Sequence, residues 1–436
     1  MRIMPKVTNN LARRILQRKS DPCASQTPAP SENTWQQVPA KFLTFETLPA
    51  YTNMRMMQEA ARGLGIGDPF FKMHEGQASV VTRVNGKTCT NFSHYNYLGL
   101  SGHKEVNAAA IEAIQRYGTT AGASRLVAGE RPVQRELEEA LAKVYDAEDA
   151  LVFVSGHATN VSTISTLFGP KDLVIHDQLA HNSILEGIRL SGATRRSFPH
   201  NNASFLDNTL RDLRSRFERV LIVVEGLYSM DGDIPHLPTL IAIKKRHGAF
   251  LMVDEAHSLG VLGASGRGIA EHFDANFKDI DIWMGTLTKA LGTCGGFIAG
   301  SKILVDILKY HAPGFVYSVG ISPPLAAAAL AALKVMQREP ERIMRLRQNS
   351  QAFLDYARKL GLNTGLSQGF SIVPIIVGSS KKAVQLSNEL YERNINVQPI
   401  IYPGVEEQVA RLRFFLSCDH QDEDLKKTCQ TLKGLI

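Results

Sequence analysis

Two segments of the sequence are the most informative about the fold. They are Gly285-Thr286-Leu287-Thr288-Lys289-Ala290-Leu291-Gly292 and the earlier Val253-Asp254-Glu255-Ala256-His257. The first segment places one lysine in a glycine-bounded turn after an apolar run, where its amine can form a Schiff base with an aldehyde cofactor. The second segment ends an apolar run with the carboxylate of Asp254, the partner that a protonated pyridine nitrogen requires. Either segment alone fits a structural role, but their order and spacing together predict a pyridoxal phosphate site.

Two further segments supply parts of a cofactor cage. His181 follows a short strand-like run at 173–177, and its imidazole can lie against a planar ring. A helix-start histidine bonded to the backbone is an equally good interpretation of His181. Gly156 and His157 follow the apolar run 152–154 in a glycine turn that opens a helix, and backbone N–H groups at a helix start bind phosphate.

With these residues in place, the chain resembles the α-oxoamine synthase family of fold-type I pyridoxal phosphate enzymes. The resemblance extends from about residue 91 to about residue 417 and includes six motifs in the family's order. They are Asn96-Tyr97-Leu98-Gly99-Leu100, Gly122-Ala123-Ser124-Arg125, Glu225-Gly226-Leu227-Tyr228-Ser229-Met230-Asp231-Gly232-Asp233, Asp254-Glu255-Ala256-His257, Thr286-Leu287-Thr288-Lys289 and Ala410-Arg411-Leu412-Arg413.

The resemblance implies four catalytic residues. Lys289 would carry the cofactor and move protons at the substrate α-carbon, and Asp254 would pair with the pyridinium. His257 would lie near the phenolic oxygen of the cofactor, and His181 would stack on its ring. The other implied cofactor contacts are Gly156, His157, Ser229, Thr286 and Ser318, and the implied substrate contacts are Asn96 and Arg413, which would hold the amino-acid carboxylate.

The chain departs from the family pattern at two places. His157 follows Gly156 where many relatives have an aromatic or other apolar residue, which changes the polarity of the phosphate cradle. Tyr402 precedes Pro403 where several relatives have an arginine, which affects the choice of acyl chain. The second departure does not disturb the assignment of the cofactor.

The function implied by the resemblance is a decarboxylative Claisen-type condensation of an α-amino acid with an acyl thioester, giving an α-aminoketone. The acyl donor would be a coenzyme A ester or an acyl-carrier protein. Another fold-type I enzyme, such as an aminotransferase or an amino-acid decarboxylase, would share Asp254 and Lys289, and a non-catalytic homologous subunit is a further alternative. The presence of Lys289 counts against the last of these.

Composition and charge limit the class of protein. The content of hydrophobic residues, 44%, and of charged residues, 21%, is ordinary for a globular protein, and the sequence offers no membrane span. The five cysteines are scattered without a close pair, which argues against a disulfide framework and a metal site and favours a reducing, cytoplasmic location. No basic face with interleaved aromatic residues is visible, so we expect no nucleic-acid partner.

The net charge of +7 is concentrated at the beginning of the chain. Residues 1–45 carry seven basic and two acidic side chains, or +5 of the total. Such an arm fits a solvated tail, a mitochondrial presequence or a docking segment for an acidic carrier protein. The segment 21–39 is rich in Pro, Ser, Thr and Gln and is typical of a linker.

Alternating strand and helix patterns predict the fold class, which is α/β with a largely parallel sheet covered by helices. The predicted strands lie around residues 151 and 173 and at 220–225, 250–253, 282–285 and 296–299, and the predicted helices include 104–117 and one that begins at Pro132. Asn85-Gly86 predicts a hairpin within 70–92.

The length of 436 residues exceeds the usual size of one domain. We expect a flexible basic arm and linker at 1–45, an N-terminal segment at 46–95, a large cofactor-binding domain at 96–323 and a smaller C-terminal α+β domain at 324–436. Fold-type I relatives complete the phosphate site from a second subunit, so the resemblance also implies a homodimer, with Ser318 as the contributed residue.

Overall fold

The computed structural model describes residues 38–63, 65 and 67–436, and the chain divides into two compact units, residues 1–65 and 66–436. The described part of the first unit contains η1 (Ala40–Phe42), η2 (Phe45–Thr47) and α2 (Pro49–Gly63). Thr44 caps η2, because its hydroxyl accepts a hydrogen bond from the N–H of Glu46. The expected basic arm falls almost wholly outside the described residues.

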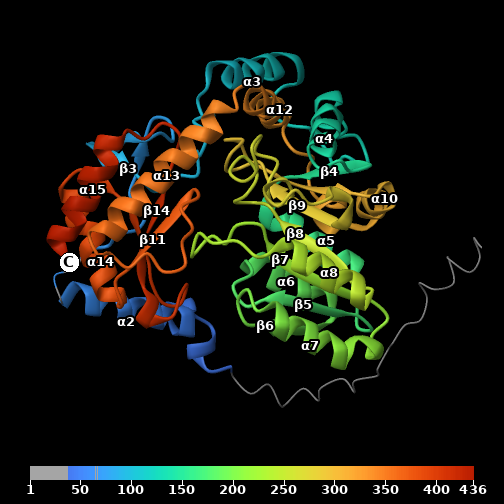
Figure 1. Ribbon diagram of the computed structural model, residues 1–436, viewed down its shortest axis with the longest axis horizontal. Helices are drawn as coiled ribbons and strands as arrows, with labels where there is room; N and C mark the ends of the chain where they lie inside the picture. Colours follow the sequence, from blue (N-terminus) through green and yellow to red (C-terminus); the bar gives the residue numbers. More distant parts are fainter. Residues whose placement is uncertain (1–37, 64, 66) are drawn as a thin grey trace, which may run out of the picture. The chain divides into compact units, whose positions relative to one another are not determined.

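The second unit is built around a seven-stranded sheet in the order β4-β10-β9-β8-β7-β5-β6 (Figure 1). Its strands are parallel except β10, which runs antiparallel to both β4 and β9. Their bounds are β4 (Asp149–Phe153), β5 (Leu173–Asp177), β6 (Thr194–Phe198), β7 (Val220–Glu225), β8 (Phe250–Asp254), β9 (Ile282–Thr286) and β10 (Gly296–Gly300). The predicted α/β class is therefore confirmed.

Helices cover both faces of this sheet, which explains why its central strands read as continuous apolar runs. One face packs against α5 (Gly156–Leu167), α6 (Asn182–Ser191), α10 (Lys302–His311) and α11 (Pro313–Val316). The other face packs against α4 (Pro132–Val144), α7 (Ala203–Leu213), α8 (Leu237–His247) and α12 (Pro323–Arg338), and α3 (Lys104–Tyr117) packs in turn on α12. Successive residues of a strand alternate between the two cores, as Val223 and Val224 of β7 do.

Strand β6 is the strand of the large sheet that the sequence did not predict. It lies at the edge of the sheet and its residues are Thr194-Arg195-Arg196-Ser197-Phe198, of which only Phe198 is buried. An edge strand with one solvated face lacks the apolar run on which the other strands were recognised. The short elements of this part of the chain are η3 (Arg214–Arg216), α9 (Ile269–His272) and η4 (Phe277–Asp279).

The C-terminal lobe contains two small sheets. One is antiparallel, in the order β11-β14-β13, with β11 (Ile372–Ile376), β13 (Gln398–Ile400) and β14 (Arg411–Phe415). The other has the order β1-β2-β3-β12, with β1 (His74–Glu75), β2 (Val81–Val84), β3 (Lys87–Asn91) and β12 (Ile395–Asn396). The helices of the lobe are α13 (Glu341–Lys359), α14 (Ser380–Glu392), η5 (Glu407–Val409) and α15 (Asp422–Leu435).

The predicted hairpin is present as β2 and β3. Asn85 and Gly86 both have positive φ, 47° and 79°, which a tight turn between two twisted strands requires. Strand β3 also pairs in parallel with β12, so residues before the large sheet join the C-terminal lobe. The N-terminal segment and the C-terminal lobe thus share one sheet.

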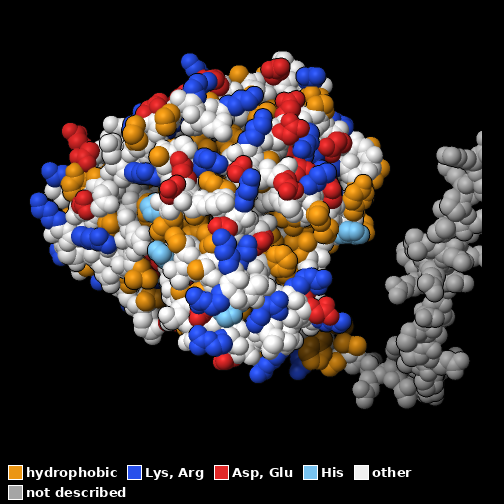
Figure 2. Space-filling model, turned by 45° about the vertical axis from the view of Figure 1, so that its right-hand side comes forward, with side chains coloured by type: hydrophobic (Ala, Val, Ile, Leu, Met, Phe, Trp, Pro, Cys, Tyr) orange, Lys and Arg blue, Asp and Glu red, His pale blue; other side chains and the backbone are white. Residues whose placement is uncertain are grey.

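The surface carries a mixed charge pattern. On the face drawn in Figure 2, lysine and arginine side chains are interspersed with aspartate and glutamate. Within the described part of the chain, no helix combines the length and the apolar character that a membrane crossing needs.

Candidate active site

The site begins at the carboxyl ends of three adjacent parallel strands. Glu225 ends β7, Asp254 ends β8 and Thr286 ends β9, and Lys289 lies in the turn that follows β9. In open α/β sheets this edge is where ligands bind, because helix N-termini and loops converge there. The two segments that the sequence analysis singled out are therefore brought together by the pairing of β8 with β9.

Asp254 is a buried carboxylate held by two hydrogen bonds. Its Oδ2 accepts from Nδ2 of Asn160 at 2.9 Å, and its Oδ1 accepts from the N–H of Ala256 at 2.9 Å. The residue is 4% exposed, and among the described residues it forms no ion pair. A buried carboxylate that is not in direct contact with a cation is costly, so the arrangement suits a positively charged partner delivered by a ligand.

Lys289 is the basic group beside this carboxylate. Burial lowers the pKa of its amine from 10.5 to about 8, although Asp254 and Glu225 act in the opposite direction. Nζ lies 5.6 Å from the centre of the Tyr95 ring. An amine with a pKa near neutrality is unprotonated often enough to attack an aldehyde, which an ordinary lysine is not.

His257 lies beneath the same region in a buried aromatic pocket. Its Nδ1 is 2.8 Å from the hydroxyl of Tyr97, and its ring stacks against Phe415 with centroids 6.4 Å apart. Burial, followed by the nearby Lys289 and Arg413, lowers its pKa well below the usual value, so the imidazole is neutral. The neutral ring is therefore available as a hydrogen-bonding group, fixed by Tyr97.

His181 is the N-cap of α6. Its Nδ1 is 2.7 Å from the hydroxyl of Ser183, and the N–H of Ser183 donates to the same nitrogen at 3.3 Å. Burial lowers the pKa of the His181 imidazole. The carboxylate of Asp254 acts in the opposite direction, and the cation of Lys289 lowers the pKa further. His181 is exposed to solvent. His181 can therefore cap α6 and also present its ring to the site, since the cap uses only Nδ1.

A hydrogen-bonded chain connects His181 to Asp254. Nδ2 of Asn160 donates both to Oδ2 of Asp254 and, at 3.0 Å, to the hydroxyl of Ser183, which in turn contacts His181. Asn160 and Ser183 are almost completely buried. The chain fixes the imidazole and the carboxylate relative to each other through one amide group.

The N-terminus of α5 lies close against the ends of β9 and β10 and leaves little room for side chains. A Cβ on Gly156 would lie 3.2 Å from Oγ1 of Thr286, and a Cβ on Gly296 would lie 2.7 Å from Cα of Gly156. Ser155 caps the helix by accepting from the N–H of Ala158. The adjoining N–H groups have the close backbone approach that a phosphate needs, and His157 is exposed beside them.

Arg413 is a half-buried cation for which the described part of the chain supplies no ion-pair partner. Its Nη1 donates to the carbonyl of Ser229 at 3.1 Å and lies 3.3 Å from Sδ of Met230, while its guanidinium packs 4.7 Å from the centre of the Phe415 ring. Its buried Nε has no partner among the described residues. Burial lowers the pKa of Arg413, and the free donors suit a carboxylate ligand.

Asn96 and Ser318 differ in their surroundings. The amide of Asn96 donates to the carbonyls of Ala78, at 2.9 Å, and Ser101, and its oxygen accepts from the N–H of Ser101, so its polar atoms hold a loop together. Asn96 also lines a pocket of about 420 Å3 beside Thr288.

Ser318 lies on an exposed segment after α11. Its hydroxyl donates to the carbonyl of Val319 at 3.3 Å.

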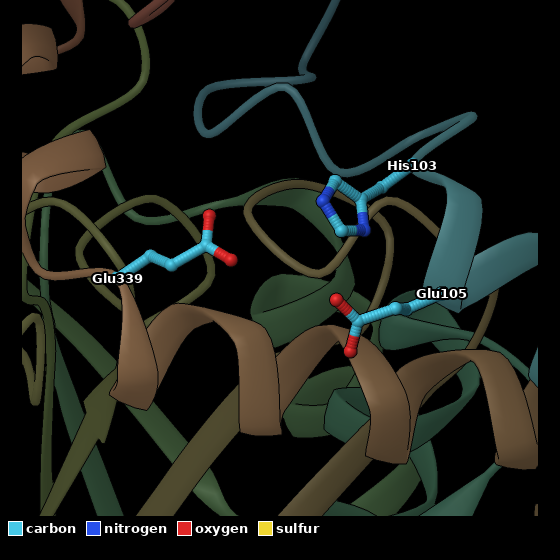
Figure 3. Close-up of side chains that lie close together, drawn as sticks. All are labelled: His103, Glu105 and Glu339. Carbon is cyan, nitrogen blue, oxygen red and sulfur yellow. The ribbon is translucent and has the colours of Figure 1, made fainter.

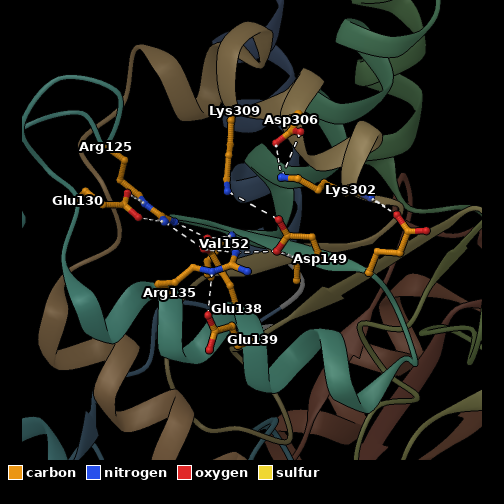
Figure 4. A network of polar contacts seen from close by, with 12 residues as sticks. Arg125, Glu130, Arg135, Glu138, Glu139, Asp149, Val152, Lys302, Asp306 and Lys309 are labelled. Carbon is orange, nitrogen blue, oxygen red and sulfur yellow. Dashed lines mark hydrogen bonds and ion pairs between the residues drawn. The ribbon is translucent and has the colours of Figure 1, made fainter.

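A charge network surrounds Arg125, the last residue of the Gly122-to-Arg125 motif (Figure 4). Arg125 forms two hydrogen bonds to Glu130 and is also paired with Glu138, which accepts from the N–H of Val152 at 3.0 Å. The neighbouring Ser124 donates to the carbonyl of Val316 at 2.7 Å. The Gly122-to-Arg125 motif therefore anchors the chain just before Ser318.

A separate cavity lies at the opposite edge of the sheet. Its volume is about 670 Å3, and its lining includes Phe250 and Ile282, the first residues of β8 and β9, together with Gly300 at the end of β10. Because Asp254 and Thr286 lie at the opposite ends of these strands, this cavity is separate from the site around Lys289.

Three side chains that resemble a metal-binding group lie elsewhere, namely His103, Glu105 and Glu339 (Figure 3). Both carboxylates already bind Arg338, whose Nη2 is 2.7 Å from Glu105 and 2.8 Å from Glu339. The arginine lowers the pKa of each. The carboxylates are accounted for as an ion-pair cluster and need no metal.

Three residues that matter to the site were not found from the sequence. Asn160 and Tyr97 bond directly to Asp254 and His257, and Glu225 is a buried carboxylate close enough to affect Lys289. Burial, followed by the charge of Asp254, raises the pKa of Glu225 well above its usual value. Tyr97 and Glu225 lie inside motifs already noted, whereas Asn160 gave no signal, because its role depends on the pairing of distant strands.

Comparisons with known proteins agree with this geometry. The model of the aminotransferase class I and II family matches residues 87–432. The 8-amino-7-oxononanoate synthase of Treponema denticola is 38% identical over 353 residues, covering 81% of this chain and 89% of that protein. That of Fervidobacterium nodosum is 41% identical over 345 residues, covering 78% and 87%. The structure of Sphingomonas wittichii serine palmitoyltransferase matches with a TM-score of 0.85 and 29% identity, covering 89% and 97%.

The chain belongs to the aminotransferase class I and II family, with the fold-type I architecture. Within it, the chain is an α-oxoamine synthase, a pyridoxal phosphate-dependent acyltransferase. Its reaction class is the decarboxylative condensation of an α-amino acid with an acyl thioester, which gives an α-aminoketone.

Proposed function

We propose that Lys289, Asp254, His181 and His257 carry out this condensation and that Arg413 holds the amino-acid substrate. The observation that carries the proposal is that a buried carboxylate, Asp254, and a half-buried guanidinium, Arg413, both without an ion-pair partner among the described residues, lie near a lysine with a lowered pKa. Each charge is costly without a partner. A ligand with a protonated ring nitrogen and a substrate with a carboxylate would satisfy both.

The described residues fit pyridoxal phosphate. Asp254 would pair with its ring nitrogen, Lys289 with its aldehyde, and the backbone of Gly156 and His157 with its phosphate, since a Cβ at Gly156 would crowd the hydroxyl of Thr286. Thr286, Ser229 and Ser318 would add hydroxyl contacts. When bound, pyridoxal phosphate supplies a conjugated ring that accepts the electrons of a broken bond at the α-carbon.

Proton movement at the α-carbon is assigned to the chain's own bases. Lys289 has a pKa near 8, so at neutral to mildly basic pH it can both accept and return a proton. His181 remains neutral near pH 7, because its pKa is lowered, and its ring is fixed through Ser183 and Asn160. His257 would act by hydrogen bonding, since it is buried and held by Tyr97.

Arg413 is assigned to the substrate carboxylate. Its planar guanidinium offers parallel donors, and its remaining contacts are a carbonyl and a sulfur atom, neither of which neutralises its charge. The relatives are named for 8-amino-7-oxononanoate, in which the amino carbon carries a methyl group, as in alanine. We therefore place L-alanine first among the amino acids to be tested, ahead of glycine and L-serine.

The acyl donor and the assembly are further parts of the proposal. The acyl group would arrive as a thioester of coenzyme A or of an acyl-carrier protein, and the basic residues 1–45 favour an acidic carrier. Two copies would form a homodimer in which Ser318 of each copy completes the other's phosphate site. Its exposed position after α11 is compatible with this role, and sedimentation of a fully active monomer would contradict it.

Product analysis tests the proposed function. The holoenzyme is incubated with single amino acids and with acyl-coenzyme A or acyl-carrier-protein donors, and carbon dioxide and products are followed by mass spectrometry. We expect carbon dioxide and an α-aminoketone in equal amounts, dependent on the thioester. An aminotransferase would release a keto acid without carbon dioxide, and an amino-acid decarboxylase would release carbon dioxide without the thioester, so either result would reject the proposal.

A further inference from the structure

Outside the residues discussed so far, the structure contains a histidine that bridges two buried carboxylates. Nδ1 of His200 is 2.9 Å from Oδ1 of Asp177, and its Nε2 is 2.8 Å from Oδ2 of Asp233. The His200 side chain is 9% exposed, and the two carboxylates are 0% and 5% exposed. Tyr228 packs edge-on against its ring, with centroids 4.5 Å apart.

The bridge carries a positive charge. A neutral imidazole has one N–H, so it can donate to only one of the two carboxylates, whereas the protonated ring donates to both. Hydrogen bonds to Asp177 and Asp233 outweigh the opposing effect of burial and raise its pKa from 6.5 to about 10. His200 is thus an imidazolium between two aspartates at neutral pH.

One end of the bridge fixes the loop that carries His181. Asp177 is the last residue of β5, and the same Oδ1 that contacts His200 also accepts from the N–H of Leu179 at 2.9 Å. The carbonyl of Asp177 accepts from the N–H of Ala180, which directly precedes His181. The turn from Asp177 to His181 is therefore organised around one carboxylate.

The other end fixes the loop that carries Ser229. The carbonyl of Asp233 accepts from the N–H of Tyr228 at 2.9 Å, which closes the loop 228–233. Within this loop the carbonyl of Ser229 accepts from Arg413. Asp231 and the carbonyl of Met230 bind Arg411, at 2.7 and 2.9 Å.

Asn201 reinforces both ends of the bridge. Its N–H donates to Oδ2 of Asp177 at 2.8 Å, and its Nδ2 donates to Oδ2 of Asp233 at 2.8 Å. His200 and Asn201, which are adjacent in the sequence, thus each contact both carboxylates. Asp177 ends β5, whereas Asp233 ends the loop 228–233.

We propose that His200 is a positioning residue that clamps together the loops 177–181 and 228–233, and so sets the imidazole of His181 relative to the guanidinium of Arg413. This inference rests on the proposed function only for the roles of His181 and Arg413. The clamp itself consists of contacts among residues that have no part in the chemistry.

The test uses the holoenzyme with three substitutions. His200→Gln removes the charge and the second ring donor, so the side chain at position 200 can no longer donate through two opposite nitrogens to both carboxylates. The double variant His200→Gln/Asp233→Asn removes the excess negative charge as well, because the amides of Gln and Asn can donate to each other and to Asp177. The matched control is His247→Gln, since His247 is 10% exposed and pairs with Asp207 at 2.8 Å but contacts neither loop.

The first measurement is hydrogen exchange followed by mass spectrometry, which needs no substrate. We expect His200→Gln to raise exchange in peptides covering 177–183 and 226–234 together, by at least about tenfold. The double variant should restore protection in both, and His247→Gln should change neither. A change confined to the neighbourhood of residue 200, or an equal effect of His247→Gln, would overturn the clamp.

The second measurement follows the consequence for the site. The probe is L-alanine, with its Kd taken from the absorbance of the bound cofactor and its α-proton exchange followed in heavy water by NMR. We expect His200→Gln to weaken binding and slow exchange, each by about tenfold, with recovery in the double variant. If wild-type enzyme binds no amino acid, the proposed function fails while the hydrogen-exchange result still decides the clamp. If both alanine readouts are unchanged in His200→Gln while both loops loosen, the positioning role is refuted.

Discussion

Asn160 and Asp254 are joined by a hydrogen bond of 2.9 Å, from Nδ2 to Oδ2, although 94 positions separate them in the sequence. The same amide donates to Ser183, which contacts His181. One asparagine on α5 therefore couples a carboxylate at the end of β8 to the histidine that caps α6. This coupling leads to the first of five predictions.

Asn160→Ala should lower turnover by about tenfold or more, because Asp254 and Ser183 both lose a donor and the carboxylate is free to turn. The unfolding free energy should fall by about 1–3 kcal/mol, the range for an unsatisfied buried polar group. Steady-state kinetics and urea unfolding of the holoenzyme measure the two effects. Asn107→Ala, which removes an exposed asparagine on α3, serves as the control. Unchanged turnover in Asn160→Ala would contradict the coupling.

Borohydride treatment of the yellow holoenzyme should leave the pyridoxyl group on Lys289, because this amine has the lowered pKa and the adjacent carboxylate that the attachment needs. Peptide mapping by mass spectrometry locates the label. Lys302→Arg, which changes an exposed lysine paired with Asp306, should be labelled at Lys289 as before. Recovery of the label on another lysine would refute the assignment of the site.

Asp254→Asn should fold and retain the shape of the site but lose most of its turnover, because the neutral amide no longer keeps a pyridine nitrogen protonated. We expect a fall in kcat of at least about a hundredfold, with thermal unfolding shifted by only a few degrees. Near-normal rates would count against an ion pair between Asp254 and the cofactor.

The pKa of Lys289 predicts how the stability of the cofactor-free protein depends on pH. Its folded pKa of about 8 lies below the unfolded value of 10.5, so between these values the unfolded chain binds more protons and stability rises with pH. The largest contribution is about 3 kcal/mol, reached above pH 10.5. Urea unfolding of wild type and Lys289→Met at pH 7, 9 and 10.5 isolates it, since only the wild type should gain this increment. A parallel pH dependence in both proteins would contradict the lowered pKa.

A shortened chain that begins at Phe45 should bind pyridoxal phosphate and use an acyl-coenzyme A donor about as well as the full chain, since the assigned residues all lie beyond Tyr95. If residues 1–45 dock an acidic carrier, the shortening should raise KM for the acyl-carrier protein alone, and salt should have the same effect on the full chain. Equal loss of activity with both donors would show instead that the arm belongs to the fold.

Short sequence patterns were sufficient to predict the helix ends and turns that depend on the backbone preferences of a few neighbouring residues. Gly118 ends α3, where its φ is 76°, Pro132 begins α4, and Asn85-Gly86 forms the turn of a hairpin, because the backbone preferences of these residues act within a few positions. The strands of the large sheet were visible because they are buried on both faces and so are continuously apolar. Edge strand β6 escaped detection for the opposite reason.

The fold class, the order of the main elements and the cofactor could be predicted from the sequence alone. The residue types and the spacing of the Asp254 and Lys289 motifs are those that binding of the cofactor requires. Only the tertiary structure decided which groups tune that chemistry. Asn160 meets Asp254 because α5 packs over β9 and β10, beside β8, and His200 reaches both Asp177 and Asp233 because β5 and β7 are adjacent in the sheet. Hydrogen bonds and pKa shifts depend on distances of a few ångströms and on the exclusion of water, which the order of residues along a chain does not specify.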